Sequence, residues 1–323
     1  MSKKFIDLFS GIGGFRIALE SNGEQCVYSS EWDKFARQTY EFNYSEIPDG
    51  DITLVDPNKI PDHDVLCAGF PCQAFSVSGK QRGFNDTRGT LFYNIANIAK
   101  QKKPRVLFLE NVRNLYKHNN GQTIATIKRI LNELDYDVHM KILNSSHYGV
   151  PQHRERIYIV CFKKHMKIGG FDFPMPSYKK ISVQDILETN IKFSEYEIKR
   201  NDIKIFGNKL LDSPELFNNN LLRPIRVGTI SKGGQGERIY SPLGHAITLS
   251  AHGGGVAGKT GAYLIDNKIR QLTEKECLRV QGFPDWFNFP DDITKSQKYK
   301  MCGNSVSVPV VNEIYKNIQL LIN

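Results

Sequence analysis

Cys72 is the side chain in this 323-residue sequence whose surroundings best suit chemistry. It lies in Gly69-Phe70-Pro71-Cys72-Gln73-Ala74-Phe75-Ser76, directly after the apolar run Val65–Ala68. Because proline fixes φ immediately before the cysteine, the pattern predicts a strand that ends in a rigid turn and presents one thiol. An exposed, aimed thiolate acts as a nucleophile, whereas most cysteines of intracellular proteins are small buried hydrophobic residues. From Cys72 alone, both interpretations stay open.

Glu110 and two arginines could complete such a site. Glu110 follows the predicted strand 105–109. In a doubly wound sheet ligands sit beyond the carboxyl ends of strands, where we expect Cys72 as well. A nucleophile with a nearby acid suits attack on an electron-poor heterocycle, whose ring nitrogen needs a proton as the adjacent carbon is attacked. Arg154 and Arg156 would face the same side of a strand. They would then steer phosphates or clamp a base edge, or simply form an exposed, salt-bridged strand.

A glycine-rich loop near the start indicates a nucleotide-type ligand. The apolar run 5–9 stops at Ser10-Gly11-Ile12-Gly13-Gly14 and a helical pattern follows, which is typical of the first unit of a nucleotide-binding α/β domain. The loop departs from the dinucleotide pattern Gly-x-Gly-x-x-Gly, so it does not imply a phosphate. Glu31, after the second predicted strand, is placed to hold both ribose hydroxyls of a nucleoside, or else to cap a helix. Trp32 would stack on an adenine or face a sulfonium, and Asp51 would accept from an adenine amino group.

The elements that must position these residues alternate along the chain. Strands are expected at 5–9, 25–29, 64–68, 105–109, 138–143 and 156–162, and helices at 91–100 and 123–134. This alternation predicts an α/β fold with a doubly wound, mostly parallel sheet.

The amino-acid composition changes after about residue 180. Glycines crowd residues 228–261, which predicts a separate, smaller, β-rich and loop-rich second domain at 186–275. The helical pattern at 310–321 is expected to pack back on the first domain. That domain is then discontinuous, with residues 1–185 and 301–323, and residues 276–300 form a hinge.

The composition indicates the kind of partner and the cellular compartment. The formal net charge of +9 favours a polyanionic partner, and 40% hydrophobic with 24% charged residues indicates a globular protein. None of the six cysteines forms a Cys-x-x-Cys pair, so neither a zinc site nor a disulfide framework is indicated. Asp7 interrupts the first apolar stretch, which argues against a signal peptide, and no apolar run approaches a membrane span. We expect a cytoplasmic protein without metal.

Five short motifs, in order, connect these observations. They are Phe9-x-Gly11-x-Gly13-Gly14, Gly69-Phe70-Pro71-Cys72-Gln73, Glu110-Asn111-Val112, Gln152-x-Arg154-x-Arg156 and Gly303-Asn304-Ser305. In this order the sequence resembles the cytosine-C5 DNA methyltransferases over nearly its whole length. The resemblance extends to residues 232–240 in the second domain, where members of the family ordinarily diverge, and is strongest to a small bacterial member with the target GCGC.

The resemblance implies an S-adenosylmethionine-dependent methyltransferase fold with a target recognition domain, and it assigns roles. Cys72 resembles the nucleophile that adds to C6 of a flipped cytosine, and Glu110 the acid that engages N3. Arg154 and Arg156 resemble the pair that flanks the base. The positions that match the pocket for the methyl donor are Phe9, Gly11, Gly13, Gly14, Glu31, Trp32, Asp51, Ile52, Pro71, Leu91, Asn304 and Ser305.

The resemblance also implies the contacts with duplex DNA. Residues 73–90 match a loop that closes over DNA, and Gln235 and Arg238 match positions that fill the stack and read guanine. The full set of expected DNA-binding residues is Ser76, Ser78, Lys80, Arg82, Arg88, Gln235, Arg238, Tyr240, Thr248 and His252. The implied enzyme is a bacterial monomer that methylates the inner cytosine of GCGC, within a restriction-modification system whose endonuclease acts separately.

Two positions depart from the pattern, and two other functions compete with DNA methylation. Cys302 stands where relatives usually carry an aromatic residue, and His252 where a close relative has tyrosine. One rival is a DNA-binding regulator with a dead active site, which the intact Cys72 and Glu110 argue against. The other is an RNA cytosine methyltransferase on the same scaffold, but the Cys-Phe-Thr signature of the tRNA-modifying relatives is missing from this sequence.

Overall fold

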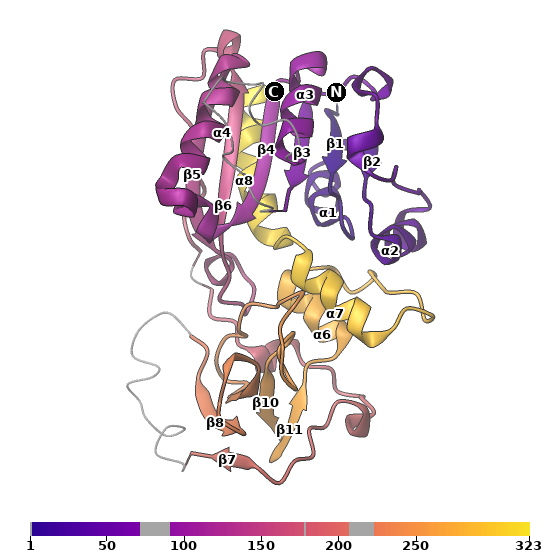
Figure 1. Ribbon diagram of the computed structural model, residues 1–323, viewed down its shortest axis with the longest axis vertical. Helices are drawn as coiled ribbons and strands as arrows, with labels where there is room; N and C mark the ends of the chain where they lie inside the picture. The colour runs from indigo at the N-terminus through magenta and orange to yellow at the C-terminus, as the bar shows by residue number, and fades with distance from the viewer. Residues whose placement is uncertain (1, 72–90, 178, 207–222) are drawn as a thin grey trace. The chain divides into compact units, whose positions relative to one another are not determined.

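The computed structural model describes residues 2–71, 91–177, 179–206 and 223–323 (Figure 1). The chain forms two compact units. The first comprises residues 1–143, 155–174 and 310–323, and the second comprises residues 144–154 and 175–309. These boundaries differ from the predicted ones, since residues 144–154, 175–185 and 276–309 all belong to the second unit.

The first unit contains a six-stranded sheet in the order β2-β1-β3-β4-β6-β5. Its strands are β1 (Lys4–Leu8), β2 (Gln25–Ser30), β3 (Val65–Gly69), β4 (Val106–Val112), β5 (Tyr136–Asn144) and β6 (Glu155–Lys163). The pairs β1–β2, β1–β3 and β3–β4 are parallel, and β4–β6 is antiparallel. All six predicted strands are present within three residues at each end, in the predicted mostly parallel arrangement.

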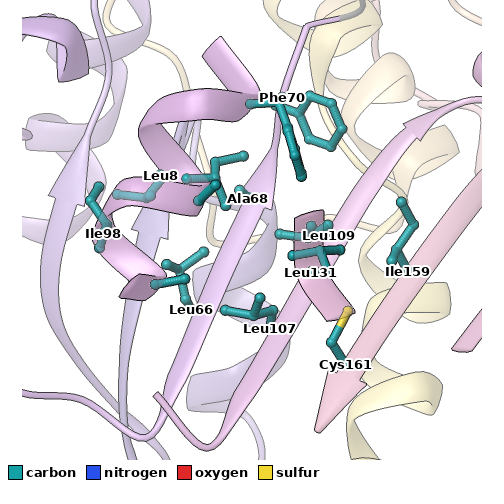
Figure 2. Packing of buried hydrophobic residues seen from close by; sticks show 14 of the residues in the cluster. Leu8, Leu66, Ala68, Phe70, Ile98, Leu107, Leu109, Leu131, Ile159 and Cys161 are labelled. Atoms are coloured by element: carbon teal, nitrogen blue, oxygen red, sulfur yellow. The ribbon is translucent and has the colours of Figure 1, made fainter. Parts of the chain in front are cut away.

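Helices cover both faces of this sheet (Figure 1). They are α1 (Gly14–Glu20), α2 (Lys34–Tyr44), α3 (Leu91–Lys102), α4 (Gln122–Glu133) and α8 (Val308–Ile322). Alternate strand residues such as Leu66 and Leu107 form one core with α3 and α4, which Figure 2 shows from close by. On the opposite face Phe108 meets Phe15 of α1, with ring centroids 5.1 Å apart. A sheet buried on both faces explains the continuous apolar runs of its strands.

Capping side chains fix two helices that periodicity did not reveal. At the start of α2, Asp33 Oδ1 accepts from the N–H groups of Phe35 and Ala36, at 3.0 and 3.2 Å. In the second unit, α6 (Glu274–Gln281) opens with a capping box of Thr273 and Glu276 and ends at Gly282, whose φ is 80°. These side chains satisfy backbone N–H groups that a helix start otherwise leaves without partners.

The second unit is built on a five-stranded sheet in the order β11-β10-β9-β8-β7. The strands are β7 (Ile203–Ile205), β8 (Arg226–Ile230), β9 (Arg238–Tyr240), β10 (Ala262–Ile265) and β11 (Lys268–Gln271), and α6 and α7 (Lys295–Asn304) complete the unit. A small core of Ile225, Val227, Ile230, Ile239 and neighbouring residues lies on this sheet. Arg270 and Glu276 form a buried two-point ion pair, with both N–O distances 2.7 Å. Among the described residues, no helix is long and apolar enough to cross a membrane.

Candidate active site

Four strands of the first unit end at one edge of its sheet. Leu8 pairs with Ser30 on one side and with Ala68 on the other, and Gly69 pairs with Glu110. The segments that follow β1, β2 and β3 therefore start side by side, next to the end of β4. This carboxyl edge is where an α/β sheet binds its ligands.

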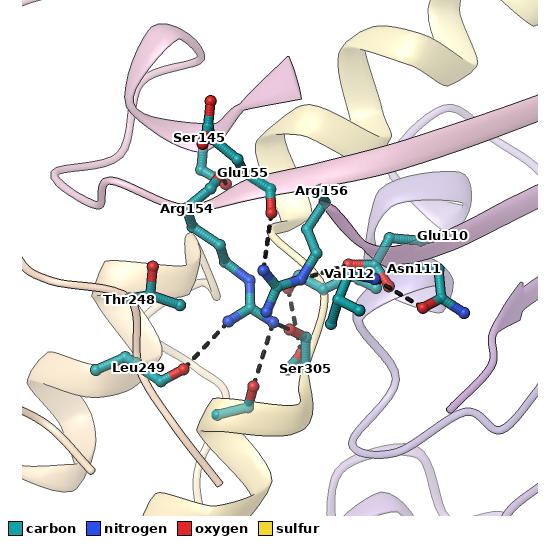
Figure 3. A network of polar contacts seen from close by, with 12 residues as sticks. Glu110, Asn111, Val112, Ser145, Arg154, Glu155, Arg156, Thr248, Leu249 and Ser305 are labelled. Atoms are coloured by element: carbon teal, nitrogen blue, oxygen red, sulfur yellow. Dashed lines mark hydrogen bonds and ion pairs between the residues drawn. The ribbon is translucent and has the colours of Figure 1, made fainter. Parts of the chain in front are cut away.

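Glu110 and Arg156 form an ion pair at this edge (Figure 3). Arg156 Nε lies 3.1 Å from Glu110 Oε1, and the two side chains are only 14% and 10% exposed. The antiparallel register of β4 and β6 brings them together, because Val112 pairs with Arg156 and Glu110 with Tyr158. Arg156 holds the Glu110 carboxyl group in one orientation at the ligand edge of the sheet, where a carboxyl group can act on a ring nitrogen by hydrogen bonding or proton transfer.

Asn111 connects Glu110 to the turn that precedes Cys72. Its Nδ2 donates to the carbonyl of Phe70 at 2.8 Å, and its Oδ1 accepts from the N–H of Val112 at 2.8 Å. Asn111 is 1% exposed, so both contacts are shielded from water. Pro71 follows Phe70 and is exposed. Cys72, the next residue in the sequence, lies outside the described residues.

The glycine loop and Glu31 form a second group at the same edge. Glu31 Oε2 accepts from the N–H of Gly11 and its Oε1 from the N–H of Asp33, both at 2.8 Å. Burial raises the pKa of Glu31, whereas these two backbone N–H groups lower it. The carboxylate is thus held in one orientation, with lone pairs left for hydroxyl donors. Phe9 and Gly11 both have φ of 55°, a left-handed conformation that is uncommon for phenylalanine.

Gly13 has to be glycine because of a tyrosine ring. Its φ is 84°, and a Cβ there would lie 2.6 Å from Cε2 of Tyr44. The Tyr44 hydroxyl donates to the Gly13 carbonyl at 3.2 Å, and the Arg16 guanidinium stacks 4.4 Å from the Tyr44 ring centroid. Packing behind the loop therefore fixes its conformation.

The chain returns to Glu31 at residues 49–52. The N–H of Glu31 donates to the carbonyl of Asp49 at 2.8 Å, which places Asp51 and Ile52 near the end of β2. Ile52 is buried, while one Asp51 oxygen accepts from the N–H of Thr53 at 2.9 Å. Trp32 is 75% exposed, so its ring is available to a planar ligand.

The other cysteines are poor nucleophiles. Cys26, Cys67, Cys161, Cys277 and Cys302 are all buried and free of disulfides. Burial raises the pKa of Cys26 to about 12 and that of the other four well above the usual range. Within the described part of the chain no thiol is therefore suited to attack, and Cys72 is the remaining candidate among the six.

Arg154 belongs to the second unit and has a different environment from Arg156. It lies one residue before β6 and is 2% exposed. Its guanidinium donates to the carbonyls of Leu249, Gly303 and Ser305 at 3.3, 3.2 and 2.7 Å (Figure 3). Of the two arginines, only Arg156 lies in the strand, and Arg154 directly precedes it.

Two glycine-rich loops of the second unit pack backbone against backbone. A Cβ on Gly236 would lie 1.9 Å from the Gly254 carbonyl oxygen, and one on Gly253 would lie 1.8 Å from that of Gly258. The N–H of Ala257 also donates to the Gly236 carbonyl at 3.0 Å. Gln235 and Arg238 are exposed on the first loop. Exposed amide and guanidinium groups on closely packed loops suit the reading of base edges.

Comparisons with known proteins identify the family. The family model for the C-5 cytosine-specific DNA methylases matches residues 3–320. The chain belongs to this family. The methyltransferase is 50% identical over 320 residues to the Type II methyltransferase M.HhaI of Haemophilus parahaemolyticus, covering 99% of this chain and 95% of that one. It is 43% identical over 320 residues to M.NgoBI of Neisseria gonorrhoeae, covering 98% of this chain and 93% of the relative.

Solved structures of low sequence identity share the fold. A DNMT2 mutant of Spodoptera frugiperda aligns with a TM-score of 0.73 at 21% identity, covering 98% of this chain and all of the other. The methyltransferase EhMeth of Entamoeba histolytica gives 0.73 at 20% identity, covering 98% of both chains. Together with the family match, they confirm the predicted methyltransferase fold. The protein is a DNA cytosine-C5 methyltransferase, and the family uses S-adenosylmethionine as methyl donor.

The described residues of the predicted methyl-donor pocket fit S-adenosylmethionine. A rigid carboxylate at Glu31, an exposed ring at Trp32 and open space above Gly11, where a Cβ would meet nothing within 4 Å, suit a ribose, an adenine and close backbone approach. Gly14 begins α1, Leu91 begins α3, and Phe9 and Leu91 pack against the core. Asn304 and Ser305 belong to the second unit, so their part in donor binding stays a prediction. No cluster of metal-ligating side chains occurs among the described residues.

The predicted DNA-binding residues divide into three groups. Ser76, Ser78, Lys80, Arg82 and Arg88 lie outside the described residues, as does Cys72. Gln235, Arg238, Thr248 and His252 are exposed. Tyr240 is only 7% exposed and packs on Tyr263, with ring centroids 6.1 Å apart, so most of its surface serves the core.

Sequence reasoning missed three buried amides. Asn111 holds Phe70, Gln152 accepts from the N–H of Leu249, and Gln281 donates to the Cys302 carbonyl. Asn111 and Gln152 lie in the motifs Glu110-Asn111-Val112 and Gln152-x-Arg154-x-Arg156. For Asn111, an amide directly after Glu110 in a recognised motif is a signal in the sequence; Gln281, at the end of a helix, has no such signal.

Proposed function

We propose that this methyltransferase flips a cytosine out of duplex DNA and methylates C5 through a transient covalent bond between Cys72 and C6. The observation that carries the proposal is the group at the end of β4. There Glu110 is paired with Arg156 at 3.1 Å, and Asn111 holds the Phe70 carbonyl two residues before Cys72. Glu110 and a thiol that follows the anchored Phe70-Pro71 segment in the sequence are the groups that attack on a pyrimidine ring at C6 needs.

Each residue has a defined part in the reaction. The thiolate of Cys72 forms a bond to C6 while Glu110 supplies a hydrogen bond or proton to N3, so that electron density develops at C5. C5 then takes up the methyl group of S-adenosylmethionine as the S–CH3 bond breaks, and S-adenosylhomocysteine leaves. The C5 proton then leaves to a base, the Cys72–C6 bond breaks, and N3 returns its proton to Glu110. Arg156 orients Glu110 and donates to O2 of the base. Flipping is required because C5 and C6 cannot be reached inside the stack.

The second unit is proposed to recognise the target GCGC and present its inner cytosine. Gln235 has a donor and an acceptor for the guanine left unpaired by flipping, and Arg238 suits the O6 and N7 atoms of guanine. Both side chains are exposed, and Arg238 Nε lies 3.5 Å from the Gly233 carbonyl. The Type II names of the relatives support a role in restriction-modification, with a separate endonuclease.

Mechanism-based trapping tests the chemistry. The protein is incubated with donor and a duplex carrying 5-fluorocytosine at the inner cytosine of GCGC. Because fluorine replaces the C5 proton, elimination fails and a denaturation-resistant protein–DNA complex should accumulate. Cys72→Ser should abolish this complex, and Cys302→Ser, at a buried thiol, should retain it. A Cys72→Ser variant that traps like the parent would show that the nucleophile is misassigned. Trapping of an RNA duplex but not of the DNA duplex would show that the substrate is misassigned.

A further inference from the structure

Side chains from two other segments donate hydrogen bonds to carbonyl groups in the last turn of α7. Helix C-termini leave carbonyl groups without intrahelical partners, and cations there are favoured by the helix dipole. In α7, the Cys302 carbonyl accepts from Gln281 Nε2 at 2.7 Å, and the Gly303 carbonyl accepts from Arg154 Nη2 at 3.2 Å. The Ser305 carbonyl also accepts from Arg154 Nη2, at 2.7 Å. Arg154 thus caps α7 at the residues that precede and follow Asn304.

The same arginine holds the segment that follows residue 248. Arg154 Nη1 donates to the Leu249 carbonyl at 3.3 Å, and the N–H of Leu249 donates to Gln152 Oε1 at 3.1 Å. Gln152 Nε2 reaches the Val280 carbonyl at 3.1 Å and Gln281 Oε1 at 3.0 Å. Arg154 is 2% exposed, and Gln152 and Gln281 are fully buried. Both the N–H and the carbonyl of Leu249 are therefore hydrogen-bonded to side chains of the segment 152–154.

Gly303 lets these two segments touch directly. A Cβ on Gly303 would lie 2.4 Å from the N atom of Ala251 and 2.5 Å from the carbonyl carbon of Ser250. Backbone atoms cannot yield as a flexible side chain can, so only glycine fits. The end of α7 and residues 249–251 form one body, fastened by Arg154.

We propose that Arg154 is a positioning residue, which fixes Asn304 and Ser305 against residues 249–251, and that it does not contact the flipped base. The inference rests on the proposed function and on the prediction, implied by the sequence resemblance, that Asn304 and Ser305 bind the methyl donor. A buried guanidinium shared among three carbonyls cannot reach a base without giving up these bonds, and its planar fork cannot be reproduced by lysine. Loss of Arg154 should therefore affect donor binding, whereas loss of Arg156 should affect the covalent step.

The test compares three identical substitutions. Arg154→Lys should weaken binding of S-adenosylhomocysteine, measured by calorimetry, by about tenfold, because charged hydrogen bonds that order Asn304 and Ser305 are lost. At saturating donor it should still trap 5-fluorocytosine DNA at a rate near that of the parent. Arg156→Lys should slow trapping and leave S-adenosylhomocysteine binding unchanged. Arg200→Lys, in the exposed pair with Asp202, is the matched control and should change neither quantity. If Arg154→Lys slows trapping like Arg156→Lys while binding S-adenosylhomocysteine normally, the proposal is overturned.

Hydrogen exchange gives a second test that needs neither donor nor DNA. The amides of Leu249 and Ser305 should exchange faster in Arg154→Lys than in the parent, and those of β3 should not. Arg154→Gln, which keeps a hydrogen-bond donor and removes the charge and the two-pronged guanidinium, serves if Arg154→Lys does not fold. Unchanged exchange at Leu249 and Ser305 in the folded variant would contradict the positioning role. A parent protein that fails to bind S-adenosylhomocysteine would contradict the proposed function instead, and the exchange rates would still decide the role of Arg154.

Discussion

Replacing Glu110 by glutamine is the perturbation that isolates the proposed acid. The substitution keeps the shape of the side chain and removes its charge and its proton. Glu110 Oε1 lies 3.1 Å from Arg156 Nε in a setting that is about nine-tenths buried. At that separation and an effective dielectric constant of about 20, the Coulomb attraction is about 5 kcal/mol. Desolvation of the two groups offsets most of it.

The expected losses in stability and turnover differ in size. An amide still accepts from Arg156, so we expect unfolding to become easier by about 1–3 kcal/mol. Single-turnover methyl transfer at saturating donor and DNA should fall by about 10²–10⁴-fold, the usual contribution of a general acid–base group. Binding of S-adenosylhomocysteine should stay near the parent value, because Glu110 acts on the base. Together these values predict a folded protein that binds the donor and turns over slowly.

A neighbouring acid provides the matched control. Glu155→Gln removes the same charge from the partly exposed pair with Arg113, and should alter stability by less than about 1 kcal/mol with turnover little changed. A Glu110→Gln variant with nearly normal turnover would remove Glu110 from the mechanism. Equal losses in both variants would indicate a general effect of charge at this edge, which would also refute the reasoning.

Three further predictions follow from other parts of the molecule. Burial raises the pKa of Asp7 from 3.8 to about 8, so the folded protein retains a proton that the unfolded chain has lost. The free energy of unfolding of the parent, relative to that of Asp7→Asn, should therefore fall by about 1.4 kcal/mol per pH unit between about pH 5 and pH 7. If the difference between the two proteins stays constant across this range, the prediction is contradicted. Gly236→Ala should weaken DNA binding in a titration while S-adenosylhomocysteine binding persists, because its Cβ would lie 1.9 Å from a backbone oxygen of Gly254, and normal DNA affinity would exclude that packing. DNA affinity should fall with salt at about −0.9 log units per log unit for each phosphate contact, and a slope near zero would argue against backbone-dominated binding.

The parts that could be predicted from the sequence depend on local patterns. Apolar runs such as Val65–Ala68 and the Gly11–Gly14 loop mark strands and a ligand edge, because a sheet buried on both faces needs uninterrupted apolar residues. Asp33 and the pair Thr273 and Glu276 are equally local capping signals. These side chains mark the starts of α2 and α6 in the sequence.

The parts that could not be predicted depend on contacts between distant residues. Arg154 and Arg156 look equivalent in the sequence, yet one meets carbonyls at 249, 303 and 305 and the other meets Glu110. Likewise, Gly236 is required only because Gly254 packs on it. Spacing along the chain carries no information on partners about 20 to 150 residues away.

The central claim, methylation of C5 at the inner cytosine of GCGC, is tested most directly by bisulfite sequencing of plasmid DNA from cells that express this chain, alongside cells that express Cys72→Ser. The account predicts that the inner cytosines of GCGC resist conversion with the parent and convert with the variant, and that the same plasmid resists a nuclease that cuts unmethylated GCGC. Protection confined to CCGG or GGCC, or spread over every CpG, would contradict the assignment of the target. Full conversion of all cytosines with the parent protein would contradict the proposed activity itself.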